Sequence, residues 1–206
     1  MAANCKSFLR FMWYYPLVVI GLILFYAYGV GSFEEPFSLT IVSCTMLLFL
    51  SLIVFLYLTS NQFQMAITFS STRKAAFGGM LAVQLLWWVC LPAVVLLMLW
   101  VVRGPEAVTF FWQIAPLELP LLLLTVAGGG LLGFATMLLR KAGRIVAYVL
   151  FVAVILGCFC IFISTLSTAA DRGSGLPIGV PLGLCGGAAA CFVGERIVAS
   201  RYCVKG

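Results

Sequence analysis

The stretch FSLTIVSCTMLLFLSLIVFLYL, residues 37–58, runs for 22 residues without a single charged side chain. A helix of about 20 mostly apolar residues is long enough to cross the hydrocarbon core of a bilayer. Five further stretches of this kind occur, at residues 11–30, 79–102, 116–139, 145–166 and 176–199. The sequence therefore predicts an all-α polytopic membrane protein, with six transmembrane helices in one domain over residues 1–206.

The composition supports this class. Of the 206 residues, 64% are hydrophobic and only 9% are charged, whereas a soluble domain carries about 25% charged residues. Spans and short connections account for nearly the whole chain, which leaves no room for a soluble catalytic or nucleotide-binding domain. The first span is too long for a cleavable signal peptide and has no small-residue cleavage site before the acidic pair that follows it.

The distribution of charge predicts the orientation. The formal charge of +6 is interpreted as a topology signal and not as a nucleic-acid surface, because cations accumulate on the cytoplasmic side of membrane proteins. With the N-terminus inside, ten cations are cytoplasmic: Lys6, Arg10, Arg73, Lys74, Arg140, Lys141, Arg144, Arg196, Arg201 and Lys205. Only Arg103 and Arg172 are then outside, together with Glu34, Glu35, Glu106, Glu118 and Asp171. Both termini are therefore predicted to be cytoplasmic.

Residues suited to chemistry are scarce. The chain has no histidine and no C-x-x-C pair among its eight cysteines, so we interpret the cysteines as small apolar side chains. No paired carboxylates or metal-ligand cluster is evident. We expect no catalytic residue, no metal site and no cofactor bound by this chain.

The stretch QFQMAITFSSTRKAAFGG, residues 62–79, interrupts the apolar pattern. Residues 59–78 form the longest predicted cytoplasmic loop, and within it Asn61 and Gln64 occupy the positions of a capping box. Phe63, Ala66 and Ile67 recur at helical spacing, as do Met65 and Phe69. A short helix with one apolar and one polar face lies along the membrane interface. It either rests on the membrane or offers its polar face to a soluble partner.

Residues 66–79, AITFSSTRKAAFGG, resemble the segment between the second and third spans of permease subunits of six-span exporters in the ABC superfamily. The matching positions are Ala66, Ile67, Thr68, Phe69, Thr72, Arg73, Lys74, Phe77 and Gly78. Ser70 departs from the pattern, because the family favours glycine there. A second likeness is GLLGFATMLLRKAGRIVAYVLF, residues 130–151, which is similar to the family's fourth span, basic turn and fifth span.

The resemblance implies that residues 62–74 contain the coupling helix, which seats on a nucleotide-binding ATPase subunit. The residues expected at this contact are Gln64, Ile67, Thr68, Phe69, Ser71, Thr72, Arg73 and Lys74. Phe63, Ile67 and Phe69 would anchor the helix to the span ends. The chain has no G-x-x-x-x-G-K-[ST] loop, so Mg-ATP would be hydrolysed on a partner chain.

Small residues recur at a spacing of four in two spans. In the last span, Gly183 and Gly187 are continued by Cys191, and a parallel row runs through Gly186, Ala190 and Gly194. Gly129 and Gly133 form a similar pair in the fourth span. Such rows let membrane helices approach closely. We expect helix packing at Gly129, Gly133, Gly183, Gly187, Ala190 and Gly194, and flexibility over residues 175–181, where Pro177 and Pro181 interrupt the row.

Two carboxylates lie within predicted spans. We place Glu118 in the first turn of the fourth span, where the helix dipole stabilises a negative charge, and leave its gating role open. We place Glu195 at the inner end of the last span, where it is neutralised by Arg196. The absence of a midplane pair of ionisable residues argues against a proton- or sodium-driven carrier.

The resemblance also implies a substrate route at the interface of two permease subunits, lined by the second and fifth spans. The candidate residues are Ser43, Thr45, Phe49, Phe55, Phe159, Phe162 and Ser164, with Thr40, Ser51 and Thr165 nearby. Such a surface suits an amphipathic, peptide or lipid-like substrate. Gln84, Trp87 and Trp88 are equally conspicuous in the third span.

Three functions follow in order of preference. The first is the permease subunit of an ATP-driven exporter in the bacterial cytoplasmic membrane, paired with a second permease copy or homologue. The second is a non-energised accessory protein of a larger membrane complex, and the third is a secondary carrier. A membrane enzyme is disfavoured. The substrate, the subunit interface and the choice between a homodimer and a heterodimer are left open.

Overall fold

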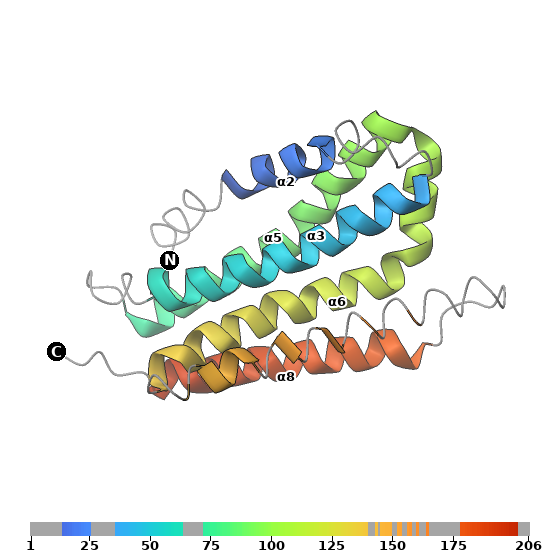
Figure 1. The fold of residues 1–206 in the computed structure, drawn as a ribbon. Helices are drawn as coiled ribbons and strands as arrows, with labels where there is room; N and C mark the ends of the chain where they lie inside the picture. Colours follow the sequence, from blue (N-terminus) through green and yellow to red (C-terminus); the bar gives the residue numbers. More distant parts are fainter. Residues whose placement is uncertain are drawn as a thin grey trace.

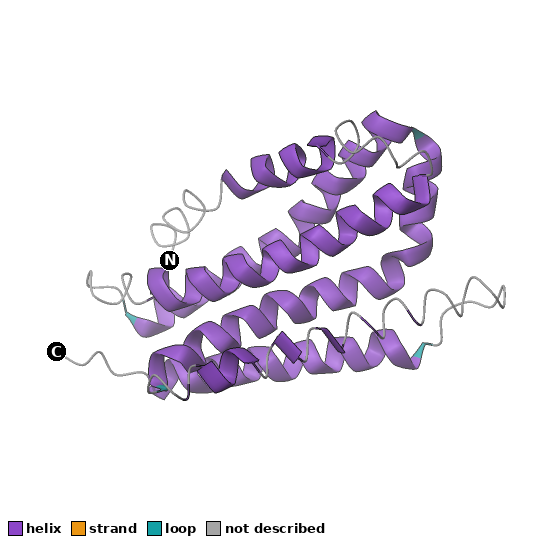
Figure 2. Cartoon of the chain, in the orientation of Figure 1, coloured by secondary structure: helices purple, strands orange, loops and turns teal. Residues whose placement is uncertain are grey.

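The structure, a computed structural model, describes residues 14–25, 36–63, 72–139 and 178–201, with 143, 145–149, 152, 153, 156, 157, 160 and 164 between the last two ranges. The regular structure of these residues is helical throughout (Figure 2). The elements are α2 (Tyr14–Leu24), α3 (Pro36–Tyr57), η2 (Leu58–Gln62), α5 (Arg73–Arg103), α6 (Pro105–Leu138) and α8 (Gly179–Arg201). The prediction of an all-α fold is confirmed for the described part of the chain.

Among the described residues, four helices are long and apolar enough to cross a membrane: Thr40–Asn61, Lys74–Arg103, Pro105–Leu138 and Gly179–Ser200. They overlap the predicted second, third, fourth and sixth spans, so the membrane class is supported. Helix α2 occupies part of the predicted first span, and most of the predicted fifth span lies outside the described residues.

Helix α6 contacts α3, α5 and α8 and forms the centre of the bundle (Figure 1). The contacts of the glycines in α6 and α8 show whether α3 and α8 run parallel or antiparallel to α6. Gly129 faces Leu52 of α3 and Gly133 faces Leu56, so the contact advances four residues on both helices. Gly187 and Gly194 of α8 face Leu124 and Leu131 of α6, an advance of seven on both.

Helices α3, α6 and α8 therefore run in the same direction, and Figure 1 shows α5 running against them. The chain leaves α6 at one end of the bundle and enters α8 at the opposite end. Thr72 and Lys74, where α5 begins, line a common cleft with Arg196, which lies near the end of α8.

The fourth span begins eleven residues earlier than the predicted position 116. Gly104 has a φ of +76°, which favours glycine, and it is the only residue between α5 and α6. Pro105 then occupies the first position of α6 and Glu106 lies in its first turn, as expected for a helix start. Hydropathy alone predicts a loop over residues 103–115. The R-G-P-E sequence at 103–106 instead signals the end of one helix and the start of the next.

Helix α6 bends in its N-terminal part, where the lime segment of Figure 1 meets the long yellow run. Pro116 and Pro120 lie inside the helix. Each removes a backbone N–H donor and sterically opposes the preceding turn, which is a common cause of helix bending. The bend lets the first part of α6 turn toward the end of α5.

The predicted loop at 59–78 is shorter in the structure. Helix α3 continues into η2, a π-helical turn in which the backbone N–H of Phe63 donates to Leu58 O. Asn61 therefore lies within this turn and does not begin a new helix, which corrects the predicted capping box. Helix α5 begins at Arg73, six residues before the predicted start of the third span at 79.

Helices α3 and α6 approach closely along Gly129 and Gly133. A Cβ atom added to Gly133 would lie 2.7 Å from Thr59 Cβ and 2.9 Å from Leu56 O, and one on Gly129 would lie 2.9 Å from Leu52 O. Side chains at these positions would force the helices apart. In hydrocarbon, where apolar burial drives association weakly, such close contact is a main source of helix–helix attraction.

We predict that Gly133→Ala destabilises the protein relative to Gly183→Ala. Alanine adds roughly 1 kcal/mol of helix propensity at both sites, but no described atom lies within 4 Å of the Cβ position at Gly183. The free energy of unfolding in mixed detergent micelles should be lower for Gly133→Ala by about 1–3 kcal/mol, the usual cost of overpacking. Equal stability of the two variants would contradict the close α3–α6 contact.

Candidate functional site

Three side chains on one face of α5, at positions 84, 87 and 88, donate hydrogen bonds to three different helices. Gln84 Nε2 donates to Glu195 Oε1 on α8 at 2.9 Å, and Trp87 Nε1 donates to Ser51 Oγ on α3 at 2.9 Å. Trp88 Nε1 donates to the carbonyl oxygen of Leu119 on α6, also at 2.9 Å. We call these three bonds the α5 hydrogen-bond cluster. It connects α5 to the rest of the bundle by polar contacts, which water cannot replace inside a bilayer.

The bond between Gln84 and Glu195 is fully enclosed, because both side chains are 0% exposed. It lies against Gly130 of α6, where a Cβ atom would overlap Glu195 Oε1 and Gln84 Nε2. A glycine at position 130 is therefore required for α5 and α8 to meet beside α6. The contact joins three helices at one point.

The position of Glu195 corrects the predicted pairing with Arg196. The Glu195 carboxyl group points into the bundle toward Gln84, whereas Arg196 is exposed and lines a cleft. Glu195 Oε2 and Gln84 Oε1 have no hydrogen-bond partner among the described residues. A charged side chain at membrane depth costs about 2.5–3.5 kcal/mol on insertion scales, so this amide donor is important for accommodating the carboxyl group.

Glu118 is not in the first turn of its helix, because α6 begins at Pro105. Its side chain is 1% exposed, and neither carboxyl oxygen has a partner among the described residues. The predicted stabilisation by a helix N-terminus is therefore wrong. The structure supplies no compensating group for Glu118 within the described part of the chain.

Aromatic side chains hold both ends of the segment between α3 and α5. The Phe63 ring, just after η2, meets the Phe134 ring of α6 edge to face, with centroids 4.6 Å apart and planes at 82°. The Phe77 ring, in the second turn of α5, packs on the same Phe134 ring, with the two ring centroids 6.4 Å apart. Phe63 and Phe134 are fully buried. We call these three residues the aromatic bracket.

Thr72 caps the start of α5. Its backbone is extended, with φ −66° and ψ 144°, and its Oγ1 accepts a hydrogen bond from the Ala75 backbone N–H at 3.3 Å. Thr72 thus marks the start of the spanning helix. Arg73 and Lys74 consequently lie in the first turn, at the positive end of the helix dipole.

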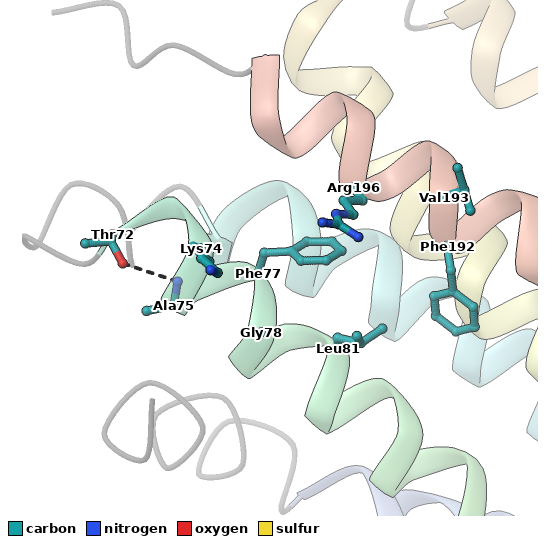
Figure 3. A pocket seen from close by; sticks show the side chains of 9 residues that line it. All are labelled: Thr72, Lys74, Ala75, Phe77, Gly78, Leu81, Phe192, Val193 and Arg196. Atoms are coloured by element: carbon teal, nitrogen blue, oxygen red, sulfur yellow. Dashed lines mark hydrogen bonds between the residues drawn. The ribbon is translucent and has the colours of Figure 1, made fainter.

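A cleft of about 660 Å³ opens between the start of α5 and the last third of α8. It is lined by Thr72, Lys74, Ala75, Phe77, Gly78, Leu81, Phe192, Val193 and Arg196. Figure 3 shows Phe77 of α5 and Arg196 of α8 pointing toward one another across it. We call it the α5–α8 cleft.

The predicted ATPase-contact residues fall partly outside the described structure. Gln64, Ile67, Thr68, Phe69 and Ser71 lie outside the described residues. Thr72, Arg73 and Lys74 are described and form the start of α5, and Thr72 and Lys74 also line the α5–α8 cleft.

The described members of the predicted substrate route differ in their exposure, and the rest of the set lies outside the described residues. Ser43 and Phe55 are buried, Phe49 is exposed, and Thr45 donates to Ile41 O at 2.8 Å within its own helix. Ser164 is exposed, and Phe159, Phe162 and Thr165 lie outside the described residues. Ser51 is a member of the α5 hydrogen-bond cluster.

The small residues of the last span differ in how closely they approach α6. A Cβ on Gly194 would lie 3.0 Å from Leu131 Cδ1, and one on Gly187 would lie 3.3 Å from Leu124 Cδ1, so both positions face α6. Gly183 and Ala190 are exposed, and no described atom lies within 4 Å of the Cβ position at Gly183.

The sequence singled out Gln84, Trp87 and Trp88 without assigning their partners. A polar side chain inside an apolar span is a recognised sign of an interhelical contact or a functional group. Its partner could not be read from the sequence, because Gln84 and Glu195 are 111 positions apart. Comparison with protein-family models, curated proteins and solved structures finds no match to this chain.

We predict that swapping the side chains of Gln84 and Glu195 preserves the stability of the protein. Placing a carboxyl group at both positions should destabilise it. Gln84→Glu places two carboxyl groups side by side and should lower the free energy of unfolding by about 3 kcal/mol. Glu195→Gln keeps an acceptor, adds a donor for Gln84 Oε1 and should stay within about 1 kcal/mol of the parent protein.

The variant carrying both changes is the control for this prediction. It restores one amide and one carboxyl group and should recover most of the loss, as measured by unfolding in mixed micelles. A double variant as unstable as Gln84→Glu would show that the two side chains do not share a contact.

Proposed function

We propose that this chain is the permease subunit of an ATP-driven ABC exporter. It would have six spans and cytoplasmic termini in a bacterial cytoplasmic membrane, and would assemble with a second permease copy or homologue. Separate ATPase subunits would bind and hydrolyse Mg-ATP. The substrate would be an amphipathic, peptide or lipid-like molecule.

The observation that carries this proposal is the aromatic bracket. Phe63 precedes the segment 64–71 and Phe77 follows it, and both rings contact Phe134 of α6. A force applied to the segment between them therefore acts on α3, α5 and α6 together. This is the mechanical property that a coupling helix requires.

The α5 hydrogen-bond cluster extends the same connection through the bundle. The three bonds link α5 to α8, α3 and α6 through Gln84, Trp87 and Trp88, respectively. A displacement of the start of α5 would therefore have to move these three helices with it or break the bonds. Buried polar contacts and packed cores rearrange between discrete states rather than deform gradually. The bundle is thus suited to transmit closure of the ATPase subunits.

The proposed topology draws support from the helix directions. Arg73, Lys74, Arg196 and Arg201 belong to the helix ends at which α5 begins and α8 ends, and Arg103 and Glu106 belong to the opposite ends. The parallel directions of α6 and α8 are consistent with the proposed fifth span between them.

The test is expression of this protein in its native membrane, followed by purification and a search for a co-purifying chain that carries a Walker A loop. Ile67→Asp combined with Phe69→Asp should abolish the complex, because two carboxylates would replace the apolar side chains that we expect to anchor the segment. The matched control, Ile67→Leu with Phe69→Leu, keeps an apolar surface and should retain it. Thermal stability in detergent checks that both variants are folded.

Three results would count against the proposal. The first is a complex with full ATP-dependent transport in the Asp variant, which would remove the coupling role of the segment. The second is an intact native complex that contains no Walker A chain, which would select the accessory role. The third is activity that follows a proton gradient and ignores depletion of ATP, which would instead select a secondary carrier.

A further inference from the structure

We propose that the α5–α8 cleft is a binding site for an anionic phospholipid, held as a resident lipid at the inner end of the bundle. The inference goes beyond the proposed function and holds whether or not the protein is an exporter. The lining of the cleft changes from cationic to apolar along the membrane normal.

Both walls of the cleft place a cation nearest the end of the bundle and apolar groups further in. On α5, Lys74 is followed seven residues later by Leu81, a rise of about 10 Å along a helix. On α8, Arg196 lies one turn nearer the helix end than Phe192 and Val193. All of these residues line the cleft, and Figure 3 shows both walls.

The positive charge of the cleft favours a negatively charged lipid head group. Of the nine lining residues two are cationic and none is acidic, and the nearby carboxyl group of Glu195 is turned inward to Gln84. Cations at a helix start are disfavoured by the helix dipole, so Lys74 adds to a positive field that a phosphate group would neutralise. Basic pockets at this level of a membrane protein are suited to anionic lipid head groups.

The dimensions and lining of the cleft favour a lipid over a free anion. A volume of about 660 Å³ lies within the range of roughly 300–1,000 Å³ typical of ligand pockets. A phosphate ion alone would leave the surfaces of Phe77, Leu81 and Phe192 unoccupied. A phospholipid would place its phosphate at Lys74 and Arg196 and part of an acyl chain along these apolar side chains.

The test uses nanodiscs that contain a minority of phosphatidylglycerol in phosphatidylcholine, with the full chain and no ATPase subunit. Lipid retained after extraction into mild detergent is quantified by mass spectrometry. The parent protein should retain phosphatidylglycerol in excess over its share of the bilayer. Lys74→Gln combined with Arg196→Gln should lower that excess roughly 25-fold, since each cation near an anionic head group contributes about a factor of five.

Arg103→Gln is the control, because it removes a cation at the opposite end of α5, and it should leave the excess unchanged. Val193→Trp fills the cleft from an exposed position and should lower retention of both lipids. Thermal stability confirms that each variant is folded.

Three outcomes would overturn the inference. The first is retention of the two lipids in the proportions of the bilayer. The second is an equal loss of phosphatidylglycerol in Arg103→Gln. The third is complete displacement of the lipid when the ATPase subunit is added, which would identify the cleft as a protein docking surface. Failure of the exporter proposal would leave the nanodisc result unaffected.

Discussion

A hydrogen bond inside a bilayer has no competition from water, and the bundle is arranged around one such bond. Gln84 of α5 donates to Glu195 of α8 at 2.9 Å, and both side chains are fully buried. The bond exists only because residue 130 of α6 has no side chain, since a Cβ there would overlap both polar groups. Three helices are therefore constrained by one contact.

The remaining contacts follow from this constraint. With α6 bound to α5 and α8 at this level, its other face is left for α3, and Gly129 and Gly133 make that approach close enough for backbone contact. Trp87 and Trp88 then reach α3 and α6 from the same face of α5. At the end of the bundle, Phe134 of α6 holds Phe63 and Phe77 on either side of the segment 64–71. The functional proposal depends on this continuity.

The helical fold class and the approximate positions of four spans could be predicted because hydropathy is a local property of the chain. Helix ends were less predictable, since Thr72 and Gly104 act through backbone geometry and capping, which hydropathy does not register. The position of Gly129 and Gly133 at a helix contact follows from their spacing, but their partner on α3 does not. The Gln84–Glu195 bond could not be predicted, because each residue offers many partners until the helices are placed. Glu195 was assigned to its sequence neighbour Arg196, whereas helix geometry turns the two side chains to different faces.

The account depends on Gln84 and Glu195 acting as one unit, and a double-mutant cycle measures this directly. Gln84→Leu and Glu195→Leu are made singly and together, and the free energy of unfolding is determined in mixed micelles. Each single variant leaves a buried polar group without its partner, whereas the double variant leaves only apolar surface. We predict a coupling energy of about 1–2 kcal/mol, with the double variant more stable than the sum of the single losses implies. Losses that add to within about 0.3 kcal/mol would show that the two residues are independent and would contradict the account.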